Sequence, residues 1–234
     1  MKSIAHRTLA ATLLACGLIH SAFAQDKTKT DTPPAQLGYA DDRKAGRLPD
    51  LTAGLSTMAA QAFGKKEWDK ARTAYLEMLK AEPDNPLTLS NLGAVEQQSG
   101  HLNEAKNYLL RAVQINPALQ QSWLALGLVC HDMGDSYLSV SALSRAVHED
   151  PSDARAHNYL AVVTRSLGWL DAAEAELQRA IELNPKYSNA QFNLALMYLD
   201  RNPPSLALAK QHYDKALALG AEKDEAVEEK LKQK

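Results

Sequence analysis

The feature that most constrains the fold is the regular spacing of four prolines. Pro83, Pro117, Pro151 and Pro185 follow one another at intervals of 34 residues, each after a short polar or acidic segment. Proline lacks the N–H group that a continuing helix requires, so each of these residues is expected to follow the end of a helix. A fixed period of 20 to 50 residues is typical of stacked repeats, and about 34 residues is the length of a helix-turn-helix unit. The spacing therefore predicts a chain built of repeated helix pairs.

Three glycines keep the same period at a different point of the repeat. Gly100, Gly134 and Gly168 stand where the first helix of each pair is expected to stop. A helix commonly ends with a residue in the left-handed conformation, which glycine adopts without a Cβ clash. Two unrelated backbone requirements thus share one period, which argues against coincidence.

Apolar residues within each unit recur with the period of a helix. Leu89, Leu92 and Gly93 lie on one face of a first helix, and Ala105 and Leu109 lie on one face of a second. These spacings indicate amphipathic helices and no strand. A small residue stands wherever the first helix must pass close to the second, and these residues are Gly93, Gly127, Ala161 and Ala195.

The sequences NLG at 91–93 and WLALG at 123–127, with the recurring Gly, Ala, aromatic or Leu, Ala and Pro, resemble the tetratricopeptide repeat family. The resemblance covers roughly residues 51–221. It implies an all-α, superhelical solenoid of about five helix-turn-helix repeats with a C-terminal capping helix. The expected organisation is a repeat domain at 50–221, with repeats at about 52–85, 86–119, 120–153, 154–187 and 188–221, followed by a charged cap at 222–234.

Three departures from the repeat pattern stand out. Lys66 occupies the position of the turn glycine in the first unit, and Ser139 replaces the usual alanine in the third. The fifth unit fits the pattern only if two residues are inserted around Pro203-Pro204, which predicts a stiff, extended elbow and an altered helix angle there.

The pattern also predicts individual elements and burial. We expect ten helices from about Asp50 to Leu219 and a further short helix near 223–232. Trp123 is expected to be largely buried between its own second helix and the preceding repeat. Leu126 is expected in the core, so its replacement by alanine should cost about 2–5 kcal/mol.

The first 24 residues are typical of a secretory signal peptide. Lys2 and Arg7 precede an apolar run from Leu9 to Ile19, and Ala22-Phe23-Ala24 provides a small-x-small cleavage site. The apolar run is too short for a transmembrane anchor, which needs about 20 residues. We therefore expect an exported protein, periplasmic or secreted, cleaved after Ala24, with residues 25–49 as a disordered linker. A lipobox-like sequence ending at Cys16 leaves open a lipoprotein anchored there.

Composition and motifs point away from enzymatic chemistry. The formal net charge is -2, and no stripe of Lys and Arg appears, so nucleic acid is not an expected partner. HExxH, CxxC, GxSxG and the glycine-rich phosphate-binding motifs are missing from the sequence, and no metal or cofactor is expected. Cys130 is interpreted as a small buried hydrophobe. The cluster His148-Glu149-Asp150 lies at the end of a second helix, where a cation is favoured by the helix dipole.

Function is expected to lie on a surface. In repeat stacks of this kind the first helices line an extended binding groove. The resemblance implies that side chains on these helices bind a protein or peptide partner, without copying the Lys and Asn set with which chaperone-binding relatives clamp a C-terminal carboxylate. The implied partner-binding residues are Ser90, Gln97, Gln121, Leu124, Leu128, His131, Arg155, Asn158, Val162, Arg165, Asn189, Phe192 and Leu196, with Leu87, Ala94 and Leu199 beside them.

Two arginines suggest the character of the partner. Arg155 and Arg165 are ten residues apart on one expected helix, so they differ by about 80° around its axis and 15 Å along it. If both are solvent-accessible, they can bracket an extended peptide that carries acidic groups. The expected function is a non-enzymatic scaffold or adaptor in envelope or secretion-system assembly. The alternative is a self-associating structural or enzyme-accessory subunit, in which case the chain forms a homo-oligomer.

Overall fold

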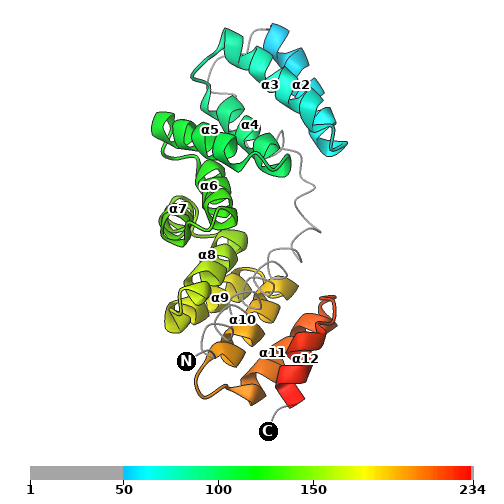
Figure 1. The fold of residues 1–234 in the computed structure, drawn as a ribbon, viewed down its shortest axis with the longest axis vertical. Coiled ribbons are helices and arrows are strands. Elements are labelled where there is room, and N and C mark those ends of the chain that lie inside the picture. Colours follow the sequence, from blue (N-terminus) through cyan, green and yellow to red (C-terminus); the bar gives the residue numbers. More distant parts are fainter. Residues whose placement is uncertain (1–49, 233–234) are drawn as a thin grey trace, which may run out of the picture. The chain divides into compact units, whose positions relative to one another are not determined.

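The computed structural model describes residues 50–232, which form two compact units at 50–151 and 152–232 (Figure 1). Within this range every regular element is a helix and no strand occurs. The first unit contains α2 (Asp50–Gly64), α3 (Trp68–Ala81), α4 (Pro86–Gln98), α5 (Leu102–Ile115), α6 (Gln120–Asp132) and α7 (Ser136–Glu149). The second contains α8 (Ala154–Ser166), α9 (Leu170–Leu183), α10 (Ser188–Asp200), α11 (Leu206–Ala218) and α12 (Glu225–Lys232).

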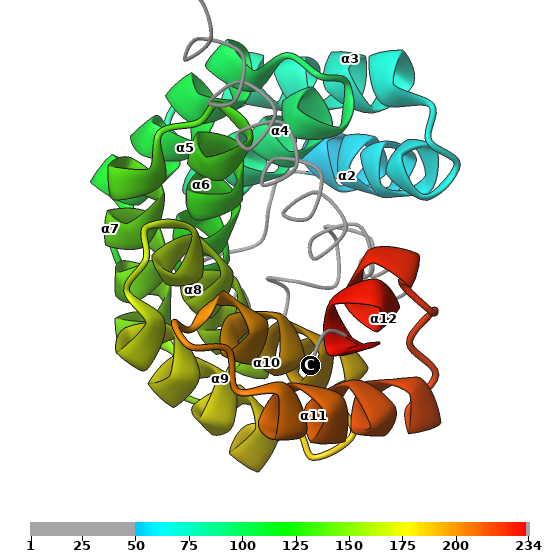
Figure 2. The same cartoon turned by 60° about the horizontal axis from the view of Figure 1, so that its bottom comes forward.

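The helices associate in consecutive pairs, as predicted. In the first unit α2 packs with α3, α4 with α5 and α6 with α7, and in the second unit α8 packs with α9 and α10 with α11 (Figures 1 and 2). The ten expected helices and the short C-terminal helix are confirmed. The fold is an all-α helical solenoid with a C-terminal helix.

The turn inside each of the first four pairs has a left-handed residue at the same place. Gly100, Gly134 and Gly168 have φ between 78° and 81°, and the N–H of the residue after each glycine donates back across the helix end. Lys66 takes this place in the first pair with φ 59°, and Glu67 N–H donates to the Ala62 carbonyl at 2.9 Å, as in the glycine turns. The first turn therefore keeps the geometry of the others without a glycine.

The small residues between paired helices are required by close packing. A Cβ added at Gly93 would lie 2.6 Å from Leu109 Cγ, and one added at Gly127 would lie 2.5 Å from Leu143 Cγ. Ser139 is fully buried in the same region, and its hydroxyl donates to the Gly127 carbonyl at 2.7 Å. A serine is tolerated at this alanine position because its hydroxyl has a hydrogen-bond acceptor.

The core follows the predicted apolar faces. Leu126 and Cys130 are fully buried, as expected. Trp123 is less completely covered and packs against the core cluster that contains Leu109 of the preceding repeat and Ala142 of its own second helix, which is the predicted place. Its indole N–H donates to the Pro117 carbonyl in the preceding turn at 2.8 Å. A buried indole needs such a partner, and the position of this carbonyl at the turn keeps the ring at the margin of the core.

The last repeat carries the predicted insertion. The link between α10 and α11 comprises residues 201–205, two more than the link 167–169 between α8 and α9. Val227 of α12 is buried in the core of this unit, and the Tyr213 hydroxyl accepts a hydrogen bond from Asp224 N–H at 2.8 Å. These contacts join α12 to the last pair as a cap. The expected signal peptide and linker lie outside the described residues.

Candidate partner-binding surfaces

In the first unit, polar side chains join the first helices of successive repeats. Ser122 of α6 donates to Ser90 of α4 at 2.8 Å between the two hydroxyl oxygens. Gln97 Nε2 donates to Asp132 Oδ2 at 3.2 Å, again from α4 to α6. Each contact joins a predicted residue of α4, Ser90 or Gln97, to a residue of α6 that was not among the predicted site residues. Leu124 is buried, whereas Ser90, Gln97, Gln121, Leu128 and His131 are partly exposed.

In the second unit, the two arginines differ from expectation. Arg165 is only 7% exposed, with Nη1 3.6 Å from Asp200 Oδ2. Burial lowers the pKa of its guanidinium, and the negative charge of Asp200 opposes that shift. The assumption that both arginines are solvent-accessible is therefore wrong for Arg165. Replacing it with glutamate would place a carboxylate near Asp200 and disturb the fold.

Arg155 is half-exposed but already paired. Its Nε and Nη2 donate to the two carboxylate oxygens of Asp153 at 3.1 and 2.9 Å, and these hydrogen bonds raise the pKa of the guanidinium. Asp153 also caps α8 by accepting from the Arg155 N–H. This pairing ties the side chain to the start of its own helix. The arrangement does not support two free cations that bracket an acidic peptide.

The most unusual pair in this unit consists of two asparagines. Asn193 Nδ2 of α10 donates to Asn158 Oδ1 of α8 at 2.9 Å, and both side chains are almost fully buried. Within the described part of the chain, Asn158 Nδ2 and Asn193 Oδ1 have no hydrogen-bond partner. Exchanging the oxygen and nitrogen of both amides would restore the pair and again leave one donor and one acceptor. Each buried group without a partner costs about 1–3 kcal/mol.

Asn193 was not among the predicted site residues. It lies 35 residues after Asn158, one more than the repeat period. The other predicted residues of this unit, Val162, Asn189, Phe192 and Leu196, are also buried.

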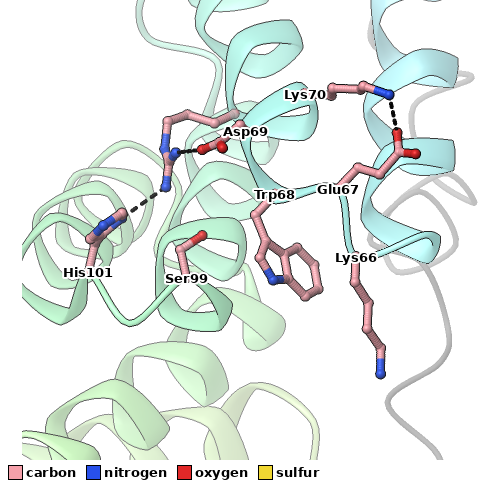
Figure 3. A pocket seen from close by; sticks show the side chains of 8 residues that line it. Lys66, Glu67, Trp68, Asp69, Lys70, Ser99 and His101 are labelled. Carbon is pink, nitrogen blue, oxygen red and sulfur yellow. Dashed lines mark hydrogen bonds and ion pairs between the residues drawn. The ribbon is translucent and has the colours of Figure 1, made fainter.

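A shallow pocket lies at the turns of the first two repeats (Figure 3). We call it the turn pocket; its volume is about 450 Å³, and its lining residues are Lys66, Glu67, Trp68, Asp69, Lys70, Arg72, Ser99 and His101.

One wall of the turn pocket is an ion-pair cluster. Arg72 donates to Glu96 at 2.6 and 2.9 Å and to Asp69 at 2.6 Å, and His101 Nδ1 lies 2.8 Å from Glu96 Oε2. Burial alone would raise the pKa of the Glu96 carboxyl, but the hydrogen bonds and charges of Arg72 and His101 outweigh it, and the pKa is lowered. The cluster fixes this wall across α3, α4 and the turn before α5.

A second polar cluster in the unit 152–232 has a structural role. Glu174 of α9 accepts hydrogen bonds from the Tyr198 hydroxyl and from Arg201, which joins α9 to α10 and to the long link after it. Burial and the bond to Glu174 raise the pKa of Tyr198 to about 12. No group of metal-ligating side chains is present among residues 50–232. In the same range, no helix combines the length and apolar character needed to cross a membrane.

Two family models, both described as tetratricopeptide repeat, match residues 88–119 and 165–224. Solved structures with the same fold include MamA from Desulfovibrio magneticus RS-1, which is 18% identical in sequence and superposes with a TM-score of 0.67. The match covers 74% of this chain and 97% of the MamA chain. The chain is a tetratricopeptide repeat protein. Such proteins generally act as non-enzymatic scaffolds, and the fold implies protein or peptide partners.

Two further comparisons add detail. The structure of YrrB, described as a tetratricopeptide repeat protein with an unusual peptide-binding site, covers 76% of this chain and 95% of its own, at 19% identity and a TM-score of 0.62. At this identity the likeness shows the fold alone. A curated relative, the heat-shock cognate co-chaperone sgt12 of Aspergillus fumigatus, is 30% identical over 123 residues, or 50% of this chain. The matched region is 36% of that co-chaperone's length.

Proposed function

We propose that this protein is a non-enzymatic adaptor that binds an extended segment of a partner protein along α8 and α10. The observation that carries the proposal is the buried asparagine pair, which keeps one amide donor and one carbonyl acceptor without partners. A peptide backbone offers the complementary N–H and C=O groups, and because both asparagines are almost fully buried it reaches them only when the residues that cover the pair move aside. Because the pair is shielded from water, hydrogen bonds made there contribute more than bonds at an exposed surface.

The surroundings of the pair suit a neutral stretch of the partner. Val162, Phe192 and Leu196 are apolar, and the charge of Arg165 is opposed by Asp200. Recognition through the backbone with apolar side chains beside it matches these groups better than recognition of a carboxylate. The fold and the co-chaperone likeness support a protein-interaction scaffold of this general type.

The test separates binding from folding. Random peptides displayed on phage are selected on the protein, and the affinity of a selected peptide is measured by calorimetry. Replacing both Asn158 and Asn193 with leucine removes the two groups that lack partners, so stability should change little or rise while peptide affinity falls at least tenfold. The matched control replaces Asn103 and Asn107, two exposed asparagines of α5, with leucine.

The opposite pattern would reject this site. If the leucine variant unfolds more easily and still binds the selected peptide with unchanged affinity, the asparagine pair serves packing alone. If the control pair weakens binding equally, the peptide does not distinguish the two surfaces. A light-scattering measurement on the same samples shows whether a self-associated form, the alternative drawn from the sequence, is present.

We also propose that the adaptor acts after export, in assembly of an envelope or secretion complex. The support is the sequence of residues 1–24, with its basic start, short apolar run and Ala22-Phe23-Ala24. Mass spectrometry of the processed protein should find Gln25 as the first residue. A mature chain that begins with lipid-modified Cys16 would establish a membrane-anchored form, and an uncleaved Met1 would contradict export by this route.

A further inference from the structure

We propose that the turn pocket is a second docking site, which binds a partner segment carrying a carboxylate next to an aromatic or other apolar side chain. The pocket lies wholly within the unit 50–151, between the turn that joins α2 to α3 and the turn that joins α4 to α5. It shares no residue with the asparagine pair of α8 and α10. The proposal therefore stands or falls independently of the adaptor function proposed above.

The first argument is the backbone of Lys66. At the equivalent turns the chain uses Gly100, Gly134 and Gly168, all with positive φ, whereas Lys66 adopts φ 59° with a full side chain. The left-handed conformation is unfavourable for a residue with a Cβ. Conformations of this kind cluster at binding sites, where the side chain has a use that glycine cannot supply. Lys66 lines the turn pocket, so its ammonium is the group that this turn would lose with glycine.

The second argument is charge. Lys70 Nζ lies 2.9 Å from Glu67 Oε2, and Arg72 is bound to Asp69 and Glu96. Lys66 is exposed and makes no ion pair with another residue of the described range 50–232. Lys66 therefore supplies the positive charge of the turn pocket that is still available to a ligand, and a carboxylate is the complementary group.

The third argument is the aromatic surface beside this cation. Trp68 is half-buried, and its ring is held against Phe63 in an edge-to-face contact with centroids 5.2 Å apart. Figure 3 shows the indole and the Lys66 side chain extending on the same side of the α2–α3 turn, with Ser99 and His101 across from them. A fixed indole next to an ammonium suits an apolar side chain next to a carboxylate, and tryptophan is enriched among the residues that dominate protein interfaces.

The remaining lining indicates a peptide rather than an enclosed small ligand. The volume of about 450 Å³ is within the range of ligand pockets, but such pockets enclose most of a ligand, whereas this one is a shallow depression, and among its described lining residues all except Trp68 are charged or polar. The cluster of Arg72, Glu96 and His101 keeps the facing wall in place without supplying a free charge. The site is therefore suited to anchor one or two side chains of a segment that continues over the surface.

The test uses nuclear magnetic resonance of the full chain and two capped tetrapeptides as probes. One is acetyl-Glu-Phe-Glu-Gly-amide, and the other has glutamine in place of glutamate. The indole N–H signal of Trp68 should shift in a saturable way with the acidic peptide, with a dissociation constant on the order of 1 mM. The indole signals of Trp123 and Trp169 provide internal references and should stay in place.

Two substitutions separate the ligand contact from the fold. Lys66→Gln should weaken the acidic peptide about threefold to fivefold, the range expected for one partly exposed ion pair. Lys66→Gly should weaken it at least as much while raising the resistance of the protein to urea, because the backbone strain is removed. Lys65→Gln, a change at the exposed neighbour outside the pocket lining, is the matched control and should leave the affinity unchanged.

Several results would overturn the proposal. Equal shifts with the glutamate and glutamine peptides would show that charge is not recognised. Shifts of all three indole signals would indicate nonspecific binding. A Trp68 signal that does not move up to 10 mM acidic peptide, or an affinity that Lys66→Gly leaves unchanged, would show that Lys66 has no part in binding a carboxylate.

Discussion

Replacing Gly127 with alanine should destabilise the protein, although alanine is the better helix former. The new Cβ would lie 2.5 Å from Leu143 Cγ and 2.7 Å from Cδ2, about 1 Å closer than carbon atoms approach without repulsion. Overpacking of this kind costs about 1–3 kcal/mol, and the gain in helix propensity returns up to about 1 kcal/mol. The net expectation is a loss of about 1–2 kcal/mol.

Gly54 provides the matched control. It lies inside α2, and an added Cβ would meet no atom within 4 Å. Gly54→Ala should therefore stabilise the protein by up to about 1 kcal/mol. The same chemical change is thus expected to have opposite signs at two helical positions, with a difference of about 2–3 kcal/mol that comes from the contact with Leu143.

A double-mutant cycle tests that contact directly. Leu143→Ala alone should cost about 2–5 kcal/mol, because it leaves a cavity. In that background the Cβ added at Gly127 enters the cavity, so its effect should change from a loss to a gain, with a coupling of about 2 kcal/mol. The free energies of unfolding are measured by urea titration followed by circular dichroism. They are compared between variants whose unfolding free energy falls with urea concentration at the same slope. If Gly127→Ala is as stable as Gly54→Ala, or if its cost is unchanged in the Leu143→Ala background, the contact does not explain the glycine.

Three further outcomes are expected. Lys66→Gly should raise the free energy of unfolding by about 0.5–1 kcal/mol in urea titrations, whereas Gly134→Ala should lower it by about 1–2 kcal/mol, because both turns require positive φ. Glu96→Gln should cost about 2 kcal/mol at pH 7. The lowered pKa of Glu96 means that this contribution is fully present above the unfolded pKa near 4.3 and is lost as pH falls through the folded pKa, so the difference in stability between wild type and variant should shrink as the pH is lowered below about 4. Leu126→Ala should cost about 2–5 kcal/mol, and an unaltered melting curve would contradict the burial of Leu126.

The ends of the helices could be predicted from the sequence because local chemistry determines them. A proline cannot continue a helix, and a residue with positive φ ends one, so Pro117 and Gly134 mark boundaries without any knowledge of tertiary contacts. The local rule does not predict the positive φ of Lys66, because lysine does not favour that conformation. The hydrogen bonds of its turn impose a conformation that the side chain does not favour.

The burial of individual polar groups could not be predicted in the same way. Arg165 is buried, and its nearest acidic partner is Asp200, a residue of the next repeat. The hydrogen bond from the Trp123 indole to the Pro117 carbonyl likewise uses a group in the turn before the helix. In both cases the polar partner lies outside the helix, and the amphipathic pattern carries no information on it.

A regular offset in the contacts between first helices offers a way to find such partners. Gln97 bonds to Asp132, Asn158 to Asn193, and Arg165 lies near Asp200, each pair 35 residues apart. The repeat period of 34 residues places equivalent residues of neighbouring first helices side by side. The residue one position after the equivalent one lies next to the side chain of the preceding repeat. Two of these three pairs contain complementary groups: the Gln97 amide donates to the Asp132 carboxylate, and the charge of Arg165 is opposed by that of Asp200. The asparagine pair differs because both side chains are almost fully buried. The carbonyl that Gln97 keeps after its single bond to Asp132 can bond to water, because Gln97 is partly exposed, whereas the donor and the acceptor left over by the asparagine pair cannot. In the proposed function, this burial of unused polar groups is what separates a site for a peptide backbone from a contact that only holds the repeats together.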